Sequence, residues 1–296
     1  MTTETIHYRY PEAIVETGWL AANLDNPNLR IFDCTTHLLY SGPDSDVPYT
    51  VKSGREDYEA GHIPGADFLD LQGELSVTDS PYRFTVPSAA QFAAALSRHG
   101  VGDGVRVILY STANAQWATR IWWMLRAFGF DNAAVLNGGW QKWQTESRPV
   151  STSPAAYPEA NFTARPRSEL FIGKDGVLSA IGDSGICTIN ALGADLHKGT
   201  DPRYGRPGRV PGSVNIPAAS LLDPETNTLL DAETVAERFE GVGANKEQRI
   251  ITYCGGGIAA TLDAFLLHQL GYENITVYDD SMSQWAKDES LPIETG

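Results

Sequence analysis

Residues 250–266 read Ile-Ile-Thr-Tyr-Cys-Gly-Gly-Gly-Ile-Ala-Ala-Thr-Leu-Asp-Ala-Phe-Leu. An apolar run of strand length ends at Cys254, three glycines follow, and an amphipathic helical pattern continues to Gly271. This order predicts a buried strand, a short loop and a helix that ends at a glycine. The same order occurs earlier in the chain, where residues 107–111 lead into a helical pattern that ends at Gly129.

The two halves of the chain also match outside these segments. A Gly-x-x-Pro-Gly turn precedes each segment, at residues 61–65 and 208–212. An apolar run, a tryptophan and a proline follow each one: residues 133–137, Trp143 and Pro149 in the first half, and residues 275–279, Trp285 and Pro292 in the second. The repeated alternation of strands and helices predicts mostly parallel sheets with helices on both faces.

The length of the chain fits two such units. It has 296 residues, 42% of them hydrophobic, which is enough to build two cores. We predict an α/β protein with a first domain over residues 1–150 and a second, catalytic domain over residues 166–296. Residues 151–165 are rich in Pro, Ser and Ala without periodicity, which indicates an extended linker.

The charge of the chain narrows its partners. A formal charge of -15 repels nucleic acids and anionic membrane surfaces, so we expect neither as a partner. The N-terminus shows no targeting pattern and no segment is long and apolar enough to span a bilayer, which predicts a cytoplasmic protein. A small anionic substrate would need a local site, made from backbone N–H groups and a few arginines.

Cysteine and histidine spacing gives no indication of a metal site or a disulfide framework. The three cysteines, Cys34, Cys187 and Cys254, show no CxxC pair, and the six histidines show no HxxxH pair. We predict that the protein uses neither a metal nor another cofactor. Cys34 and Cys187 lie in strand-like runs and are expected to be core residues.

Cys254 is predicted to be a nucleophile. It ends a strand at the edge where parallel sheets bind ligands, and it directly precedes a helix N-terminus, which stabilises a thiolate. A cysteine that only fills the core does not require three following glycines, each of which lowers stability by roughly 0.5–1 kcal/mol relative to alanine. The amides expected to point at its sulfur belong to Gly255, Gly256, Gly257, Ile258 and Ala259.

Two other functions fit parts of this loop. Residues 255–260 match a dinucleotide-binding G-x-G-x-x-A, with Asp279 and Asp280 at the distance of a ribose-binding acid. However, the first half lacks glycines at the equivalent place, so the match is not a property of the fold. A phosphatase of the C-x5-R type needs an arginine at position 260, where this chain has alanine.

The chain resembles the tandem-domain rhodanese family, the thiosulfate and 3-mercaptopyruvate sulfurtransferases, over nearly its whole length. The segments that carry the resemblance are residues 58–66, 136–140, 199–202, 208–217 and the Cys254 loop. The resemblance implies two rhodanese-like domains, of which the first is inactive because Ser111 replaces the catalytic cysteine. It also implies that Cys254 takes a sulfur atom from a small anionic donor as a persulfide, and that cyanide or a thiol then removes it.

The resemblance leaves the donor open. Thiosulfate enzymes often have basic residues in this loop and mercaptopyruvate enzymes commonly have a serine, whereas residues 255–259 have neither a charge nor a hydroxyl group. The family keeps an anion-holding arginine near residues 198–209, which makes Arg203, Arg206 and Arg209 the candidates for substrate binding. His62 matches Arg209 in the repeat and is expected to be structural. A persulfide sensor or partner-binding module with little turnover is the alternative function.

Overall fold

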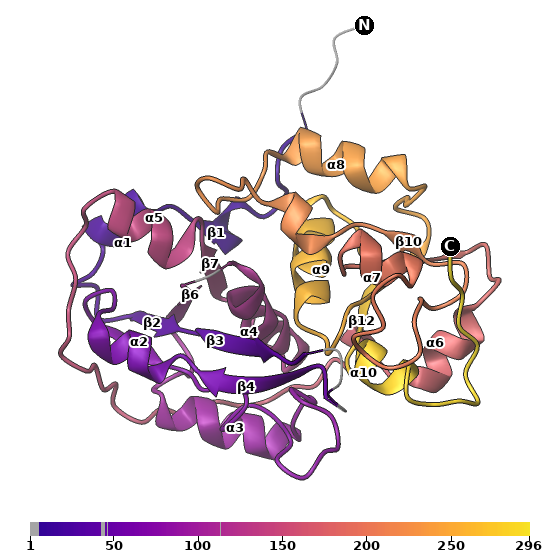
Figure 1. Cartoon of the computed structure of the whole chain (residues 1–296). Coiled ribbons are helices and arrows are strands. Elements are labelled where there is room, and N and C mark those ends of the chain that lie inside the picture. Colours follow the sequence, from indigo (N-terminus) through magenta and orange to yellow (C-terminus); the bar gives the residue numbers. More distant parts are fainter. Residues whose placement is uncertain (1–5, 43–44, 46, 113) are drawn as a thin grey trace, which may run out of the picture.

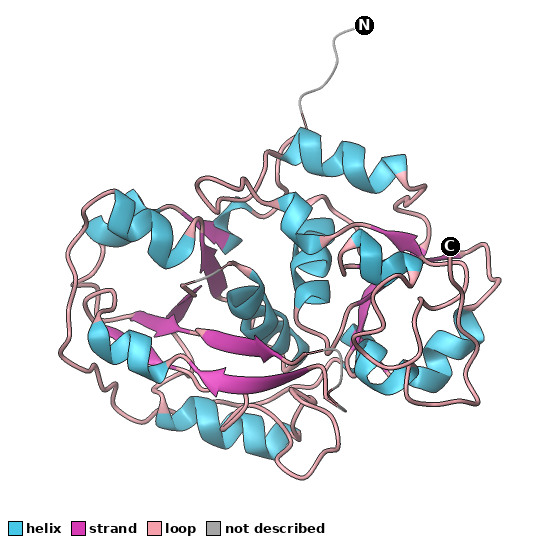
Figure 2. Cartoon of the chain, viewed as in Figure 1, coloured by secondary structure: helices cyan, strands magenta, loops and turns pink. Residues whose placement is uncertain are grey.

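A computed structural model describes residues 6–42, 45, 47–112 and 114–296 of the chain. Two five-stranded parallel sheets form its two halves, with helices on both faces (Figures 1 and 2). The strands of the first sheet, in spatial order, are β1 (Ile14–Val15), β7 (Ala133–Leu136), β6 (Arg106–Tyr110), β2 (Leu29–Asp33) and β5 (Ala66–Phe68). The matching strands of the second are β8 (Phe171–Ile172), β12 (Ile275–Tyr278), β11 (Arg249–Tyr253), β9 (Ile186–Asn190) and β10 (Val214–Asn215).

The helices follow the same repeat. Those of the first half are α1 (Thr17–Ala22), α2 (Arg55–Ala60), α3 (Ala89–Arg98), α4 (Gln116–Ala127) and α5 (Gly139–Thr145). Those of the second are α6 (Lys174–Ala180), α7 (Ala194–Lys198), α8 (Ala232–Gly241), α9 (Ala259–Gln269) and α10 (Ser281–Trp285). Short 3-10 turns are η1 (Pro11–Ala13), η2 (Ser168–Leu170) and η3 (Ala218–Leu221).

Local contacts repeat as closely as the topology does. Helices α4 and α9 both end in a Schellman motif, in which Gly129 and Gly271 adopt φ values of 86° and 84°. The indole N–H of Trp143 donates to the Pro149 carbonyl, as that of Trp285 donates to the Pro292 carbonyl. The predicted repeat is confirmed at this level, although each of the four strands predicted around it ends one residue earlier than expected.

The two halves meet through α4 and α9. The hydroxyl groups of Thr119 and Thr261, which occupy matching positions, lie 3.1 Å apart, and Trp122 packs edge-on against Phe265. Every residue of α9 from Ala260 to Gln269 is buried. The expectation of an amphipathic helix was therefore wrong for α9, because α4 covers the side that would otherwise face solvent.

A two-stranded antiparallel hairpin of the first half packs against the second half. Its strands are β3 (Thr36–Tyr40) and β4 (Tyr49–Ser53), and the rings of Tyr49 and Tyr204 are in edge contact across the two halves. Residues 152–167 contain neither helix nor strand. The strands of the first sheet fall within residues 14–136 and those of the second within 171–278, while the predicted domain boundaries stay a prediction.

Candidate active site

Cys254 lies between β11 and α9, and only 2% of its surface is exposed. Its N–H donates to Ser281 Oγ at 3.0 Å, and Ser281 Oγ donates to the Tyr278 carbonyl at 2.6 Å. Ser281 has a left-handed φ of 49°, at the place where the first half has Gly139 with φ 52°. This conformation is strained for a residue with a side chain. The two hydrogen bonds of Ser281 Oγ offset the strain and thereby hold the backbone beside Cys254 in place.

Four carbonyl groups of the Cys254 loop, residues 254–258, are held by donors outside it, that of Ile258 by Thr261 N and Oγ1 (2.9 and 2.7 Å). Cys254 O accepts from Met282 N (3.0 Å), Gly255 O from Ser283 N and Oγ (2.8 and 2.7 Å), and Gly257 O from Arg120 Nη1 (3.0 Å). The C=O and N–H groups of a trans peptide point in opposite directions, so the N–H groups that follow these carbonyls face away from the donors. Among the described residues, no protein acceptor takes a hydrogen bond from the amides of residues 255–258.

The three glycines of the loop differ in how much space a Cβ atom would have. A Cβ atom at Gly255 would lie 2.0 Å from the Tyr204 hydroxyl oxygen, and one at Gly257 would lie 2.4 Å from the Asp279 carbonyl oxygen. Gly257 also has a left-handed φ of 72°. A Cβ atom at Gly256 would lie 3.1 Å from its nearest neighbour, the Tyr49 hydroxyl oxygen, so this is the least crowded of the three positions.

Two tyrosines close over the loop, one from each half. The hydroxyl group of Tyr204 packs against Gly255, and the hydroxyl group of Tyr49 lies next to Gly256. Burial raises the pKa of Tyr49 to about 12 and that of Tyr204 well above its usual value. Both phenols therefore stay protonated over the physiological range, and they can donate a hydrogen bond to a sulfur anion at the loop.

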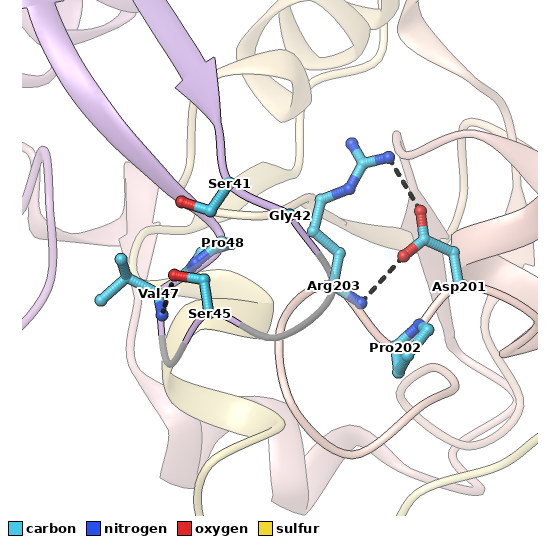
Figure 3. Close-up of a pocket in the computed structure, with 8 residues that line it drawn as sticks. All are labelled: Ser41, Gly42, Ser45, Val47, Pro48, Asp201, Pro202 and Arg203. Carbon is cyan, nitrogen blue, oxygen red and sulfur yellow. Dashed lines mark hydrogen bonds and ion pairs between the residues drawn. The ribbon is translucent and has the colours of Figure 1, made fainter.

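Two pockets flank the hairpin segment before Tyr49. One, of about 250 Å³, lies between the hairpin and residues 201–203, and Arg203 lines it with its guanidinium group paired to Asp201 at 2.8 Å (Figure 3). The other, of about 220 Å³, is lined by Tyr49, Ser283, Arg83 and Lys287 among others. Each pocket therefore contains at least one cationic side chain. Each is also lined by residues that contact the Cys254 loop or that are next in the sequence to a residue that does.

The structure separates the three candidate arginines. Arg206 donates to the carbonyl groups of four residues at the end of α10 and beyond it, Trp285, Ala286, Asp288 and Leu291. Arg209 contacts His197 O, the Gly296 carbonyl and the Glu294 carboxylate. Both guanidinium groups hold the C-terminal segment. Arg206 also lines a pocket of about 10 Å³ with Tyr204 and Met282, whereas Arg203 lines the larger pocket of about 250 Å³.

Comparison with known proteins decides the family. The model of the rhodanese-like domain matches residues 16–146 and 195–288. The chain belongs to the rhodanese family. The 3-mercaptopyruvate sulfurtransferase of Escherichia coli K12 is 31% identical over 284 residues, which cover 95% of this chain and 97% of the relative. The mitochondrial thiosulfate/3-mercaptopyruvate sulfurtransferase 1 of Arabidopsis thaliana is 30% identical over 308 residues, 96% of this chain and 78% of that protein.

A solved rhodanese structure agrees with the fold. SseA from Escherichia coli, a 3-mercaptopyruvate sulfotransferase, superposes with a TM-score of 0.78 at 29% identity, covering 91% of this chain and 98% of its own. The predicted class is confirmed: two tandem rhodanese-like domains, each with a mostly parallel sheet and helices on both faces. The chain is a sulfurtransferase, and the alternative of a module with little turnover is not favoured.

The remaining cysteines and His62 occupy structural settings in the rhodanese domains. Burial raises the pKa of Cys34 well above its usual value and also raises that of Cys187, so neither thiol ionises readily. Both ring nitrogens of His62 lie against backbone oxygens, those of Tyr58 and Ser153. The described ranges contain no cluster of three or more His, Cys, Asp or Glu side chains that could hold a metal ion.

None of the helices that the structure describes is long and apolar enough to reach across a bilayer.

Several residues at the site could not be recognised from the sequence. Arg120, Tyr49 and Phe84 come from the first domain, far from Cys254 in the chain, and reach its loop only through the packing of the two domains. Ser281 and Ser283 follow β12, as Gly139 follows β7. A signal for them was present, since residues after the next strand of a parallel sheet lie at the same edge as Cys254.

Proposed function

We propose that this rhodanese carries a sulfane sulfur on Cys254 as a persulfide, taken from thiosulfate or 3-mercaptopyruvate and passed to cyanide or a thiol. The observation that carries the proposal is the arrangement of the Cys254 loop, in which outside donors hold four carbonyl groups. The amides of residues 255–258 then remain available to stabilise negative charge on the sulfur atoms. The roles predicted for Gly255, Gly256, Gly257, Ile258 and Ala259 are part of this proposal; Ala259 is the first residue of α9, where an N–H group has no acceptor within the helix.

The proposed reaction has two steps. The Cys254 thiolate attacks the outer sulfur of the donor, an S–S bond forms, and the donor's own bond to that sulfur breaks. Thiosulfate then releases sulfite with the electron pair, whereas mercaptopyruvate releases the pyruvate enolate, which takes up a proton to give pyruvate. In the second step the acceptor attacks the outer sulfur of the persulfide and restores the Cys254 thiolate.

Arg203 is our candidate for holding the anionic end of the donor. Its guanidinium group lies at a pocket of about 250 Å³, and the following residue, Tyr204, touches the loop at Gly255. Asp201 pairs with it, so a donor anion would compete with or displace that carboxylate (Figure 3). An acidic protein needs such a local cation to recruit a small anion.

Intact mass after incubation with each donor tests the persulfide. The wild-type protein should gain one sulfur atom that peptide mapping places on Cys254, and cyanide should remove it. The gain should be absent from Cys254→Ser and unchanged in Cys34→Ser, which serves as the matched control. Equal loading of Cys34 or Cys187 would contradict the proposal.

The first domain is proposed to be inactive, because Ser111 stands at the place of Cys254. A cytoplasmic location stays a prediction; the name of the similar plant protein places that protein in mitochondria.

A further inference from the structure

We infer that Arg120, a residue of the first domain, is a positioning residue for the reaction at Cys254: it sets the orientation of the peptide between Gly257 and Ile258. This inference rests on the proposed function of Cys254. It also gives the first domain a role in catalysis without a nucleophile of its own. A positioning residue acts through the loop and does not itself touch the donor.

Arg120 is fully buried and bridges the two domains. From α4 it donates to Gly257 O at 3.0 Å, to Phe84 O at 2.6 Å and to Asp279 Oδ1 at 2.7 Å. Its guanidinium group also lies over the ring of Phe171, 5.2 Å from the centroid. A planar fork with several fixed N–H groups is suited to hold acceptors from three segments in one arrangement.

Asp279 completes the arrangement. Its second carboxylate oxygen accepts from the N–H of Val86 at 2.7 Å, and its carbonyl oxygen closes against Gly257. The neighbouring Asp280 accepts from the Thr85 hydroxyl group at 2.8 Å. Residues 84–86 and Arg120 of the first domain therefore hold both the loop and the residues that follow β12.

The repeat shows that this contact is not a general requirement of the fold. When α4 and α9 are aligned on Gly129 and Gly271, the position of Arg120 corresponds to Leu262 in α9. Leu262 lines a pocket beside Asn114 and Gln116 of the first domain, so it faces the matching loop without a hydrogen-bonding group. The arginine is thus present only on the helix that faces the Cys254 loop.

The consequence for chemistry follows from peptide geometry. Because Gly257 O points at Arg120, the N–H of Ile258 points to the opposite side of the peptide, away from Arg120. Without the arginine, the peptide next to the left-handed Gly257 is free to rotate. A misplaced amide no longer stabilises the charge on sulfur, which should slow the chemical step and leave donor binding little changed.

Single-turnover loading of Cys254 with sulfur tests the inference, with thiosulfate and 3-mercaptopyruvate as the probes. We expect Arg120→Ala to load at least about tenfold more slowly at saturating donor. The KM should change less than twofold, and the pH at which loading is half-maximal should move upward. Arg120→Lys, which can still donate to Gly257 O, should recover part of the rate. A role in folding alone would move neither the pH profile nor the split between kcat and KM.

Matched variants separate the possible failures. Thr119→Val removes another contact between the domains and should load at the wild-type rate. If Arg120→Ala does not fold because Asp279 loses its cationic partner, the double variant Arg120→Met with Asp279→Asn removes both charges of the pair together and should show the same slow loading. Wild-type loading rates in the folded variants would overturn the inference, and so would an equal loss in Thr119→Val. Failure of the wild-type protein to load Cys254 would instead overturn the proposed function.

Discussion

The loop at Ser111 and the loop at Cys254 are built on the same strand and helix, but they use their amides differently. In the Ser111 loop, the described residues of 111–115 make hydrogen bonds within the first domain: Thr112 N–H donates to Thr35 Oγ1, and Gln116 N–H to Asn114 Oδ1. The Ser111 hydroxyl group donates to the Asn114 carbonyl. In the Cys254 loop, outside donors hold the carbonyl groups, and no described protein group accepts from the amides of residues 255–258.

The difference predicts that a cysteine at position 111 alone would not make the first domain reactive. One contact is shared, since Ser111 O accepts from Trp140 N–H as Cys254 O accepts from Met282 N–H. The differences lie in the side chains around the loops: Asn114 and Thr35 occupy amides in the first domain, whereas Ser283 and Arg120 occupy carbonyl groups in the second. Side chains of the first domain therefore contribute to the Cys254 loop, while the inactivity of the first domain itself stays a prediction.

Exchanging the nucleophiles should break the comparison most clearly. We expect Cys254→Ser to lower turnover at least about a thousandfold, because a hydroxyl group does not form the sulfur anion that the reaction needs. Adding Ser111→Cys to that variant should not restore turnover, because the amide that follows position 111, that of Thr112, is already hydrogen-bonded to Thr35 Oγ1. Steady-state assays with both donors provide the measurement. Recovery to within tenfold of wild type would show that the cysteine is sufficient.

Crowding at Gly255 should have the next largest effect. Gly255→Ala places a Cβ atom 2.0 Å from the Tyr204 hydroxyl oxygen, so the loop or the ring has to move by about 1 Å. A displacement of that size should lower kcat/KM about a hundredfold. Two ring carbons of Tyr204 would also lie 2.3 and 2.7 Å from this Cβ atom, so the ring has to be removed as well as the oxygen, and adding Tyr204→Ala should restore much of the loss. No recovery in the double variant would mean that the glycine is required by its backbone and not by the tyrosine.

The fold and the position of Cys254 were predictable from the sequence because their signals are local. Apolar runs, terminal glycines and repeated spacing act within about 20 residues, and the predicted strands and helix ends follow them closely. Arg120, Tyr49 and Phe84 carried no such signal, since they reach the loop through the packing of α4 and of the hairpin. The burial of α9 on all sides was missed for the same reason.

The arginines illustrate a second limit. Residues 203, 206 and 209 are equivalent in charge and spacing, so the sequence offers no reason to prefer one. Which of these guanidinium groups is occupied by other contacts depends on the C-terminal segment. This segment lies some 80 residues further along the chain, and its carbonyl groups accept hydrogen bonds from Arg206.

Arg203 and Arg206 provide a matched pair for the third prediction. We expect Arg203→Ala to lower kcat/KM for the donor about tenfold, through the loss of a charged hydrogen bond at a partly exposed site. Arg206→Ala should instead lower the melting temperature, because it leaves several backbone carbonyl groups without donors. Kinetics and thermal unfolding on both variants distinguish the two roles. Equal kinetic losses at equal stability would place the donor anion near Arg206 as well.

The smallest expected effect concerns a pH-dependent contact that only the first domain has. His99, at the end of α3, lies between Asp67 Oδ2 at 2.7 Å and Glu74 Oε2 at 2.9 Å, whereas α8 has Val242 at the matching position. Burial acts to lower the pKa of His99, but the hydrogen bonds to the two carboxylates and their charges outweigh it and raise the pKa to about 9.

The sign of the effect on stability follows from linkage. Because the pKa of His99 in the folded state lies above its usual value of 6.5, its contribution is fully present below about pH 6.5 and is lost as the pH rises through about 9. We expect that loss to be about 1–2 kcal/mol of unfolding free energy, after allowance for solvent screening at this partly exposed pair of carboxylates. His99→Gln keeps a donor between the carboxylates without titrating, so the difference from wild type isolates the histidine. Urea unfolding of both proteins between pH 6 and 10 should show the two curves converging as the pH rises; a constant gap would mean that His99 acts through packing, as Val242 does in the second domain.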